Sequence, residues 1–179
     1  VNGSNNVMDE AGHGTHVAGI IAAEANNGLG ISGTAPQVKI MAVRITGQSG
    51  ASYTDAAAAD AILYAAENGA DIINCSFGCD APCSKEDNPL IGGQIIDAYL
   101  AGVIVVFAAG NAGKNVADFF PQNMPETIVA GSSKPNDQML SDSNQGVLVD
   151  VVAPGQRILS LRTSQPYAGS VFYMDDPVN

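Results

Sequence analysis

Few residues of this chain are basic. Seven lysines and arginines stand against eighteen aspartates and glutamates, which gives the 179 residues a formal net charge of −11 at pH 7. Nucleic acids and anionic membrane surfaces attract basic proteins, so neither is the expected partner. Charged residues make up only 14% of the sequence and are spread along it, which indicates a solvated acidic surface.

Long apolar runs are absent as well. No run approaches the length of a membrane span, and residues 1–8 lack a signal-peptide pattern. No Gly-x-Gly-x-x-Gly lies between an expected strand and an expected helix, and no phosphate loop is present, which argues against a nucleotide-binding domain. The chain has no internal repeat, and its hydrophobic content of 46% is typical of a soluble protein. We therefore expect one domain over residues 1–179.

Cysteine is scarce, with residues only at positions 75, 79 and 83. Cys75 lies in an apolar, strand-like run and is expected to be a small buried residue. Cys79 and Cys83 flank a loop that contains Pro82, and a local disulfide there requires an exported protein. A metal site is the weaker alternative, because the spacing does not match a zinc knuckle.

Apolar runs and helical stripes alternate along the chain. A strand, a helix and a further strand in succession predict a right-handed crossover and a parallel sheet. The carboxyl ends of parallel strands meet at one edge of a sheet, so residues 76–78 and 108–111 should lie close together. The expected strands are residues 38–44, 70–76, 102–111, 127–132 and 147–152, and the expected helices are 55–68, capped by Thr54, and 90–101.

Residues 12–23 hold the most informative stretch, Gly-His-Gly-Thr-His-Val-Ala-Gly-Ile-Ile-Ala-Ala. The glycines beside His13 allow a tight turn, and the small apolar run predicts a helix buried on every side. His13 would then stand at the helix N-terminus. There the helix dipole would keep it neutral, as a general base must be.

Simpler interpretations of these histidines exist. Taken alone, His13 and His16 would more often be packing or capping residues than catalytic ones. A metal pair is disfavoured because no acidic residue lies between them.

The histidine stretch resembles the histidine block of the subtilisin-like serine proteases, the subtilases. Three later segments resemble the same family in the same order. They are Ile-Asn-Cys-Ser-Phe-Gly at 73–78, Val-Phe-Ala-Ala-Gly-Asn at 106–111 and Val-Asp-Val-Val-Ala-Pro-Gly at 149–155. The resemblance implies an α/β three-layer sandwich with a central, mostly parallel sheet, incomplete at both ends. It also implies peptide-bond hydrolysis by a serine, a histidine base and an aspartate.

The resemblance assigns roles by position. His13 would be the base and Asn111 the oxyanion-hole donor. An extended polypeptide would bind between two walls, with Ala108, Ala109 and Gly110 lining a pocket whose small residues suggest room for a large side chain. One wall would hold Gly50 and Ser52, and the other Ser76, Phe77 and Gly78. A pro-segment inhibitor and a secreted or cell-surface location also follow from the family.

Residues 25–36 form a loop rich in asparagine and glycine, which by itself indicates a turn. In subtilases a loop of this pattern wraps a calcium ion, a hard cation that prefers oxygen ligands. By position, Asn27 would supply its side chain, and Ala25, Leu29 and Ile31 their carbonyls. The family's remaining ligands come from upstream of Val1, so the site within this chain would be incomplete.

Two family motifs are missing from residues 1–179. No Asp-Ser/Thr-Gly precedes His13, and Asp9 is both too close and followed by the wrong residues. No Gly-Thr-Ser-Met-Ala is present, and Ser160, Ser164 and Ser170 stand in unrelated contexts. We therefore expect the middle of a catalytic domain, inactive by itself because a base needs a nucleophile. The alternative is a peptide-binding pseudoprotease whose triad has been lost.

Overall fold

The computed structural model of the protein describes residues 6–46 and 52–163. Its contacts divide the chain into two compact units. The larger unit comprises residues 54–156, and the smaller unit comprises the chain up to residue 53 together with the chain from residue 157 onward.

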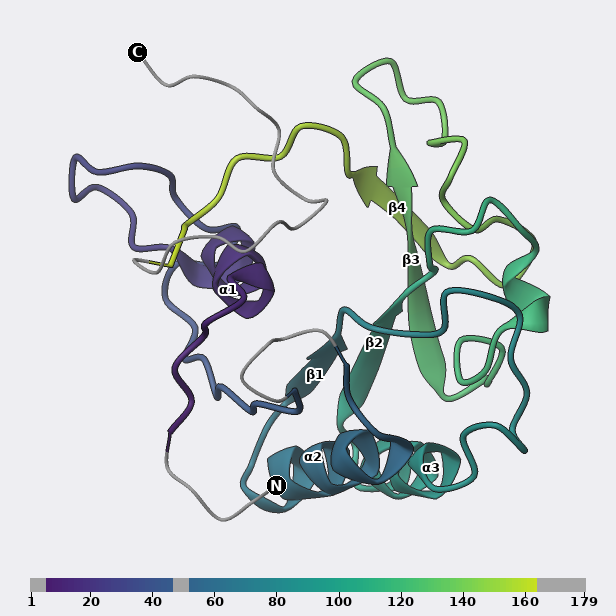
Figure 1. Cartoon of the computed structure of the whole chain (residues 1–179). Coiled ribbons are helices and arrows are strands. Elements are labelled where there is room, and N and C mark those ends of the chain that lie inside the picture. Colours follow the sequence, from purple (N-terminus) through teal and green to yellow (C-terminus); the bar gives the residue numbers. More distant parts are fainter. Residues whose placement is uncertain (1–5, 47–51, 164–179) are drawn as a thin grey trace. The chain divides into compact units, whose positions relative to one another are not determined.

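A parallel sheet forms the centre of the larger unit (Figure 1). Its strands lie in chain order, with each neighbouring pair parallel, and Cys75 of β1 is in register with Phe107 of β2. The strands are β1 (Ile72–Cys75), β2 (Ile104–Ala108), β3 (Thr127–Ser133) and β4 (Val151–Pro154). The predicted parallel α/β class is confirmed, although β4 begins later than the predicted strand at 147–152.

Two helices pack against each other and against β1 and β2. They are α2 (Asp55–Glu67) and α3 (Ile91–Leu100), and a short 3-10 helix, η1 (Val116–Asp118), follows β2. Thr54 caps α2 as predicted, because its hydroxyl accepts a hydrogen bond from the Ala57 N–H at 3.1 Å. Phe107, Ile62 and Ile95 are fully buried, whereas Ile72, Ile104 and Ile128 alternate onto the other face of the sheet and are exposed.

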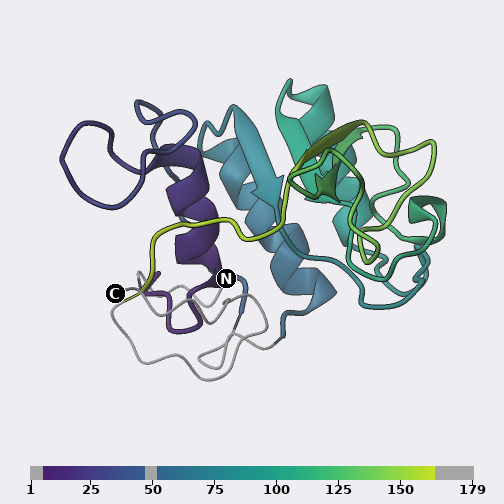
Figure 2. The ribbon, with the colours of Figure 1, turned by 90° about the horizontal axis from the view of Figure 1, so that it is seen from above.

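Helix α1 (His13–Ala22) belongs to the smaller unit, and the chain at residues 158–161 runs beside it (Figure 2). Gly19 is buried there, because a Cβ at this position would collide with Ser160 and Leu161. Ile20 is 37% exposed, so the prediction of a helix buried on every side is wrong. The apolar run was correctly assigned to a helix, but in this unit the neighbouring chain covers only part of its surface.

The C-terminal end of α1 is closed by a returning segment of backbone. The N–H groups of Gly33, Thr34 and Ala35 donate to the carbonyls of Ala23, Ile20 and Ile21 at 2.9, 2.9 and 2.8 Å. These carbonyls belong to the end of a helix, where no intrahelical donor remains for them. Gly33 permits this approach, since a Cβ there would lie 2.5 Å from the backbone nitrogens of Ala22 and Ala23.

We expect Gly33→Ala to lower the free energy of unfolding by about 1–3 kcal/mol, because the backbone of the last helical turn must move. Gly93→Ala in α3 is the matched control. A Cβ there meets nothing within 4 Å, so it should instead stabilise by up to about 1 kcal/mol. Thermal melts and amide exchange at residues 33–35 measure both effects. Equal effects of the two substitutions would contradict the close packing at Gly33.

Residues 38–44 do not form a strand, so that prediction is wrong. Val38, Ile40 and Met41 are 50%, 46% and 41% exposed, and no described strand pairs with this segment. A strand needs a neighbour for its ladder hydrogen bonds, and an apolar sequence alone does not supply one.

None of the helices in the described part of the chain combines the length and the apolar character that a membrane span requires.

Candidate active site

Asp9 organises the start of helix α1. Its carboxylate accepts hydrogen bonds from the backbone N–H groups of Gly12 (2.6 Å), Thr15 (2.7 Å) and Ala11 (3.1 Å). It also accepts one from the Thr15 hydroxyl at 2.7 Å. Gly12, the residue before the helix, has a φ of 89°, a conformation that suits glycine. The Asp9 carboxylate thus caps the first turn of α1, and the predicted tight turn before His13 is confirmed.

These hydrogen bonds make the start of α1 sensitive to acid. Burial by itself would raise the pKa of Asp9, but the hydrogen bonds from Gly12, Thr15 and Ala11 outweigh it and lower the pKa below 3.8. A group with a lowered folded-state pKa stabilises the fold above its unfolded pKa and loses that contribution as the pH falls through the folded value.

We therefore expect protection of the Gly12 and Thr15 amides to persist through pH 3.8 and to disappear only below it. An NMR titration of these amides measures the midpoint. Asp9→Ala should remove the transition and cost about 1 kcal/mol, the usual contribution of a helix cap. A midpoint above the ordinary aspartate value would contradict this account.

His13 is the first residue of α1, and its side chain is exposed. Desolvation by the surrounding fold lowers the pKa of His13, the charge on His16 lowers it further, and Asp9 opposes both. The direction agrees with the predicted neutral imidazole, and its largest cause is desolvation. His16 has a different environment, with its Nε2 3.1 Å from the carbonyl oxygen of Ile158.

Asn111 lies in the larger unit, just beyond the end of β2. Its side chain is exposed, and its amide has no hydrogen-bond partner among the residues that the structure describes. Gly110 before it has a φ of 100°, which turns the chain away from the strand. The amide of Asn111 is therefore presented to solvent at the carboxyl edge of the sheet, where ligands of parallel sheets bind.

A second asparagine, Asn144, holds this turn in place through side-chain hydrogen bonds. Asn144 is completely buried, and its Nδ2 donates to the carbonyl of Ala109 at 2.8 Å. Its Oδ1 accepts from the N–H groups of Ala112 (3.1 Å) and Lys114 (3.0 Å). A Cβ at Gly110 would lie 2.6 Å from its Nδ2, so glycine is required there. Asn144 was not predicted, because residues 141–146 have the composition of an ordinary turn.

Residues 76–78 and 108–111 come together as predicted. Residues 76–78 follow β1, residues 108–111 start at the last residue of β2, and these two strands are paired. A residue that was not predicted, Gln122, connects the two segments. Its Nε2 donates to the carbonyl of Ala108 at 3.2 Å, and a Cβ at Gly78 would lie 2.6 Å from the same nitrogen. Gln122 is 2% exposed, and its Oε1 has no partner among the described residues.

The other candidate residues lie in the smaller unit or outside the described residues. His13 and Ser52 belong to the smaller unit, whereas Asn111 and the segments around Gln122 belong to the larger one. The geometry of these residues is therefore described separately for each unit. Gly50 lies outside the described residues.

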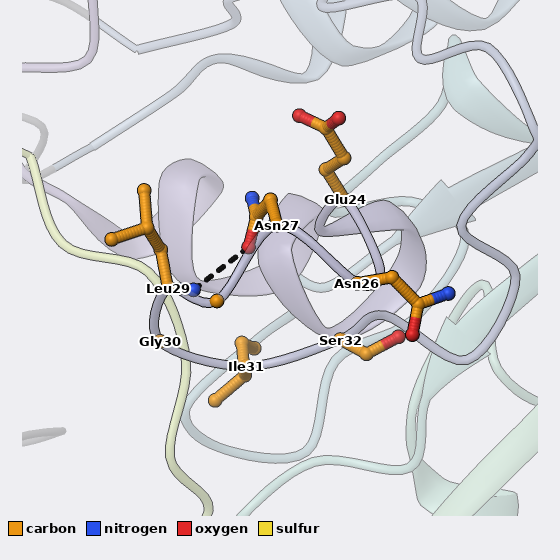
Figure 3. Close-up of a pocket in the computed structure, with 8 residues that line it drawn as sticks. Glu24, Asn26, Asn27, Leu29, Gly30, Ile31 and Ser32 are labelled. Carbon is orange, nitrogen blue, oxygen red and sulfur yellow. Dashed lines mark hydrogen bonds between the residues drawn. The ribbon is translucent and has the colours of Figure 1, made fainter.

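The loop after α1 surrounds a hollow of about 230 Å³ (Figure 3). Asn27 points its Oδ1 at the N–H of Leu29, 2.9 Å away, which leaves the oxygen a second lone pair. Glu24, Asn26 and Ser32 also line the hollow, so its polar side chains are rich in oxygen. These donors fit a hard cation, although no group of three or more His, Cys, Asp or Glu is found among the described residues.

The three cysteines agree with the first interpretation given above, a buried Cys75 and a local disulfide. Cys79 and Cys83 form a disulfide, with their Cα atoms 6.4 Å apart. Cys75 is free and buried, and burial raises the pKa of its thiol to about 12, so it is not a nucleophile. The disulfide lies immediately after Gly78 and fixes the chain that leaves the 76–78 segment.

Known proteins are similar to this chain in sequence and in fold. The model of the subtilase family matches residues 1–176. A thermophilic serine proteinase from Bacillus sp. strain AK1 is 45% identical over 161 residues, which cover 90% of this chain and 38% of that protein. Thermitase from Thermoactinomyces vulgaris is 43% identical, with coverages of 88% and 54%. The chain thus spans about half or less of these relatives.

A solved protease from Pseudoalteromonas arctica superposes with a TM-score of 0.72 at 36% identity. It covers 80% of this chain, which covers 43% of it. A cold-adapted subtilisin-like serine proteinase gives a TM-score of 0.70 at 31% identity, with coverages of 86% and 52%. The match of the family model over almost the whole sequence, together with this fold, shows that the chain belongs to the subtilase family.

Proposed function

We propose that this chain is the middle part of a serine endopeptidase. His13 acts as the general base, and Asn111 donates a hydrogen bond to the oxyanion that forms on the scissile carbonyl. The aspartate and the serine of the triad lie outside residues 1–179, so the isolated chain does not hydrolyse peptides.

The observation that carries the proposal is the position of His13 in a chain of this family. It begins a helix whose first turn is capped by Asp9, and its pKa is lowered, so the imidazole is neutral near pH 7. A neutral imidazole is able to accept the proton of an attacking hydroxyl. Because the carboxylate of Asp9 is occupied by the helix start, a different aspartate must orient His13.

The proposed substrate is a polypeptide in extended conformation. Residues 76–78 form one wall of its cleft and Gly50 and Ser52 the other, and the main chain of the substrate adds as an extra strand. Ala108, Ala109 and Gly110 line the pocket for the residue before the scissile bond. A pro-segment that occupies the same cleft is the proposed inhibitor.

Labelling of the full-length protein with a fluorophosphonate tests the proposal. This probe reacts with activated serines, so we expect one labelled serine outside residues 1–179 and no label on the isolated chain. A protein that binds extended peptides but is never labelled would establish a peptide-binding pseudoprotease. Label on Ser160 would overturn the assignment of the nucleophile.

We further propose that the protein works outside the cell. The Cys79–Cys83 disulfide is stable in an oxidising compartment, and one relative, 38% identical, is an extracellular protease of Xanthomonas campestris.

The loop after α1 is the proposed calcium site, held by the side chain of Asn27 and the carbonyls of Ala25, Leu29 and Ile31. Bound calcium would fix the loop and stabilise the folded state by mass action. We expect calcium to raise the melting temperature of the full-length protein and Asn27→Ala to weaken that rise. Asn136→Ala in another exposed turn is the control. Equal calcium shifts in both variants would place the ion elsewhere.

A further inference from the structure

Gln122 fills the space between the two segments that line the proposed pocket. Its amide nitrogen contacts the end of β2 through the carbonyl of Ala108, 3.2 Å away. The same nitrogen lies against Gly78, where even one added carbon would approach within 2.6 Å. One side chain therefore contacts both segments.

The position of Gln122 is fixed by its surroundings. Phe119 and Phe120, which precede it, are 1% and 6% exposed, and the Phe120 ring occupies the place of a side chain at Gly92 of α3. The Phe120 N–H donates to the carbonyl of Cys83 at 3.1 Å, and Cys83 is joined by the disulfide to the residue after Gly78. The buried residues before Gln122 and the disulfide that follows Gly78 thus link the two segments.

The buried amide oxygen of Gln122 makes no hydrogen bond to the described residues, so what this side chain contributes at the pocket is its volume. The Oε1 of Gln122 has no hydrogen-bond partner among the described residues, and such a buried acceptor usually costs about 1–3 kcal/mol. An apolar side chain of similar size would fill the space without that cost. The small residues at 108–110 suggested room for a large substrate side chain, but that expectation did not include Gln122.

We infer that Gln122 is the specificity-determining residue of the pocket, a plug that makes it shallow. The inference rests on the proposed function. A shallow pocket accepts alanine or serine before the scissile bond and excludes phenylalanine and leucine by volume. Selection therefore follows from the size of residue 122, and its hydrogen-bonding group is not required.

The test compares kcat/KM of the full-length protein on two peptides that differ only in having alanine or phenylalanine before the scissile bond. We expect the wild type to prefer alanine and Gln122→Ala to raise the phenylalanine-to-alanine ratio about tenfold or more, because the plug is removed. Gln122→Leu keeps the volume and should keep the preference. Gln94→Ala in α3, which removes another buried amide oxygen without a described partner, should leave the ratio unchanged.

Each outcome has a definite meaning. A wild type that prefers phenylalanine overturns the inference without any variant, as does an unchanged ratio in a folded Gln122→Ala. A ratio altered equally by Gln122→Leu would replace selection by volume with selection by hydrogen bonding. If neither peptide is cleaved, or if cleavage survives His13→Ala, the proposed function itself fails.

Discussion

His13→Ala should reduce kcat of the full-length protein by about a million-fold, the scale observed when the triad histidine of a subtilisin is removed. The substitution leaves the nucleophile without a base and the leaving amine without an acid. Since His13 is exposed at the first position of α1, the melting temperature should change little. Steady-state kinetics with a peptide substrate and a thermal melt measure the two effects.

His16→Ala is the matched control on the same helix. It loses the contact with the carbonyl of Ile158, so about 1 kcal/mol of stability should disappear while activity stays within about tenfold of wild type. If His16→Ala were the inactive variant and His13→Ala the active one, the assignment of the base would be reversed.

Asn111→Leu should lower kcat by about 100- to 1000-fold with little change in KM, as seen for an oxyanion-hole asparagine in a subtilisin. The substitution removes an N–H that acts on the charge of the transition state while roughly keeping the size of the side chain. Because Asn111 is exposed and unpaired among the described residues, its loss should not destabilise the larger unit. A rise in KM at unchanged kcat would instead indicate ground-state binding.

Asn144→Leu provides the contrast. This residue is buried and makes three side-chain hydrogen bonds to the turn that carries Asn111, so its replacement should cost about 3 kcal/mol or more. Activity and stability should fall together in that variant, and only activity should fall in Asn111→Leu. Identical behaviour of the two variants would contradict separate roles.

Local patterns predicted the elements that carry their own signal. The apolar run at 102–111 contains β2, and Thr54 caps α2 because a hydroxyl at that position satisfies a helical N–H. Residues 38–44 have an equally apolar pattern but form no strand. Whether such a segment pairs depends on a neighbour that is distant in sequence, and the segment's own residues do not specify one.

The residues of the candidate site also fall into two groups, those that a local motif identifies and those that only the fold identifies. His13 and Asn111 stand in recognisable motifs, whereas Gln122 and Asn144 are ordinary polar residues in loops. What distinguishes them is burial against Ala108 and Ala109, which only the folded sheet brings near. The role of Asp9 was missed for a related reason. It caps α1 from four residues before His13, and a cap is normally sought at the residue next to the helix.

The closure at the end of α1 has one more consequence. Because the Gly33 N–H lies 2.9 Å from the Ala23 carbonyl oxygen, residues 24–32 leave the fold and return to it at nearly the same point. Loops with adjacent ends accept inserted sequence at little entropic cost. A peptide tag placed between Gly28 and Leu29 should therefore leave α1 intact, while it separates Asn27 from Leu29 and so removes the proposed calcium site.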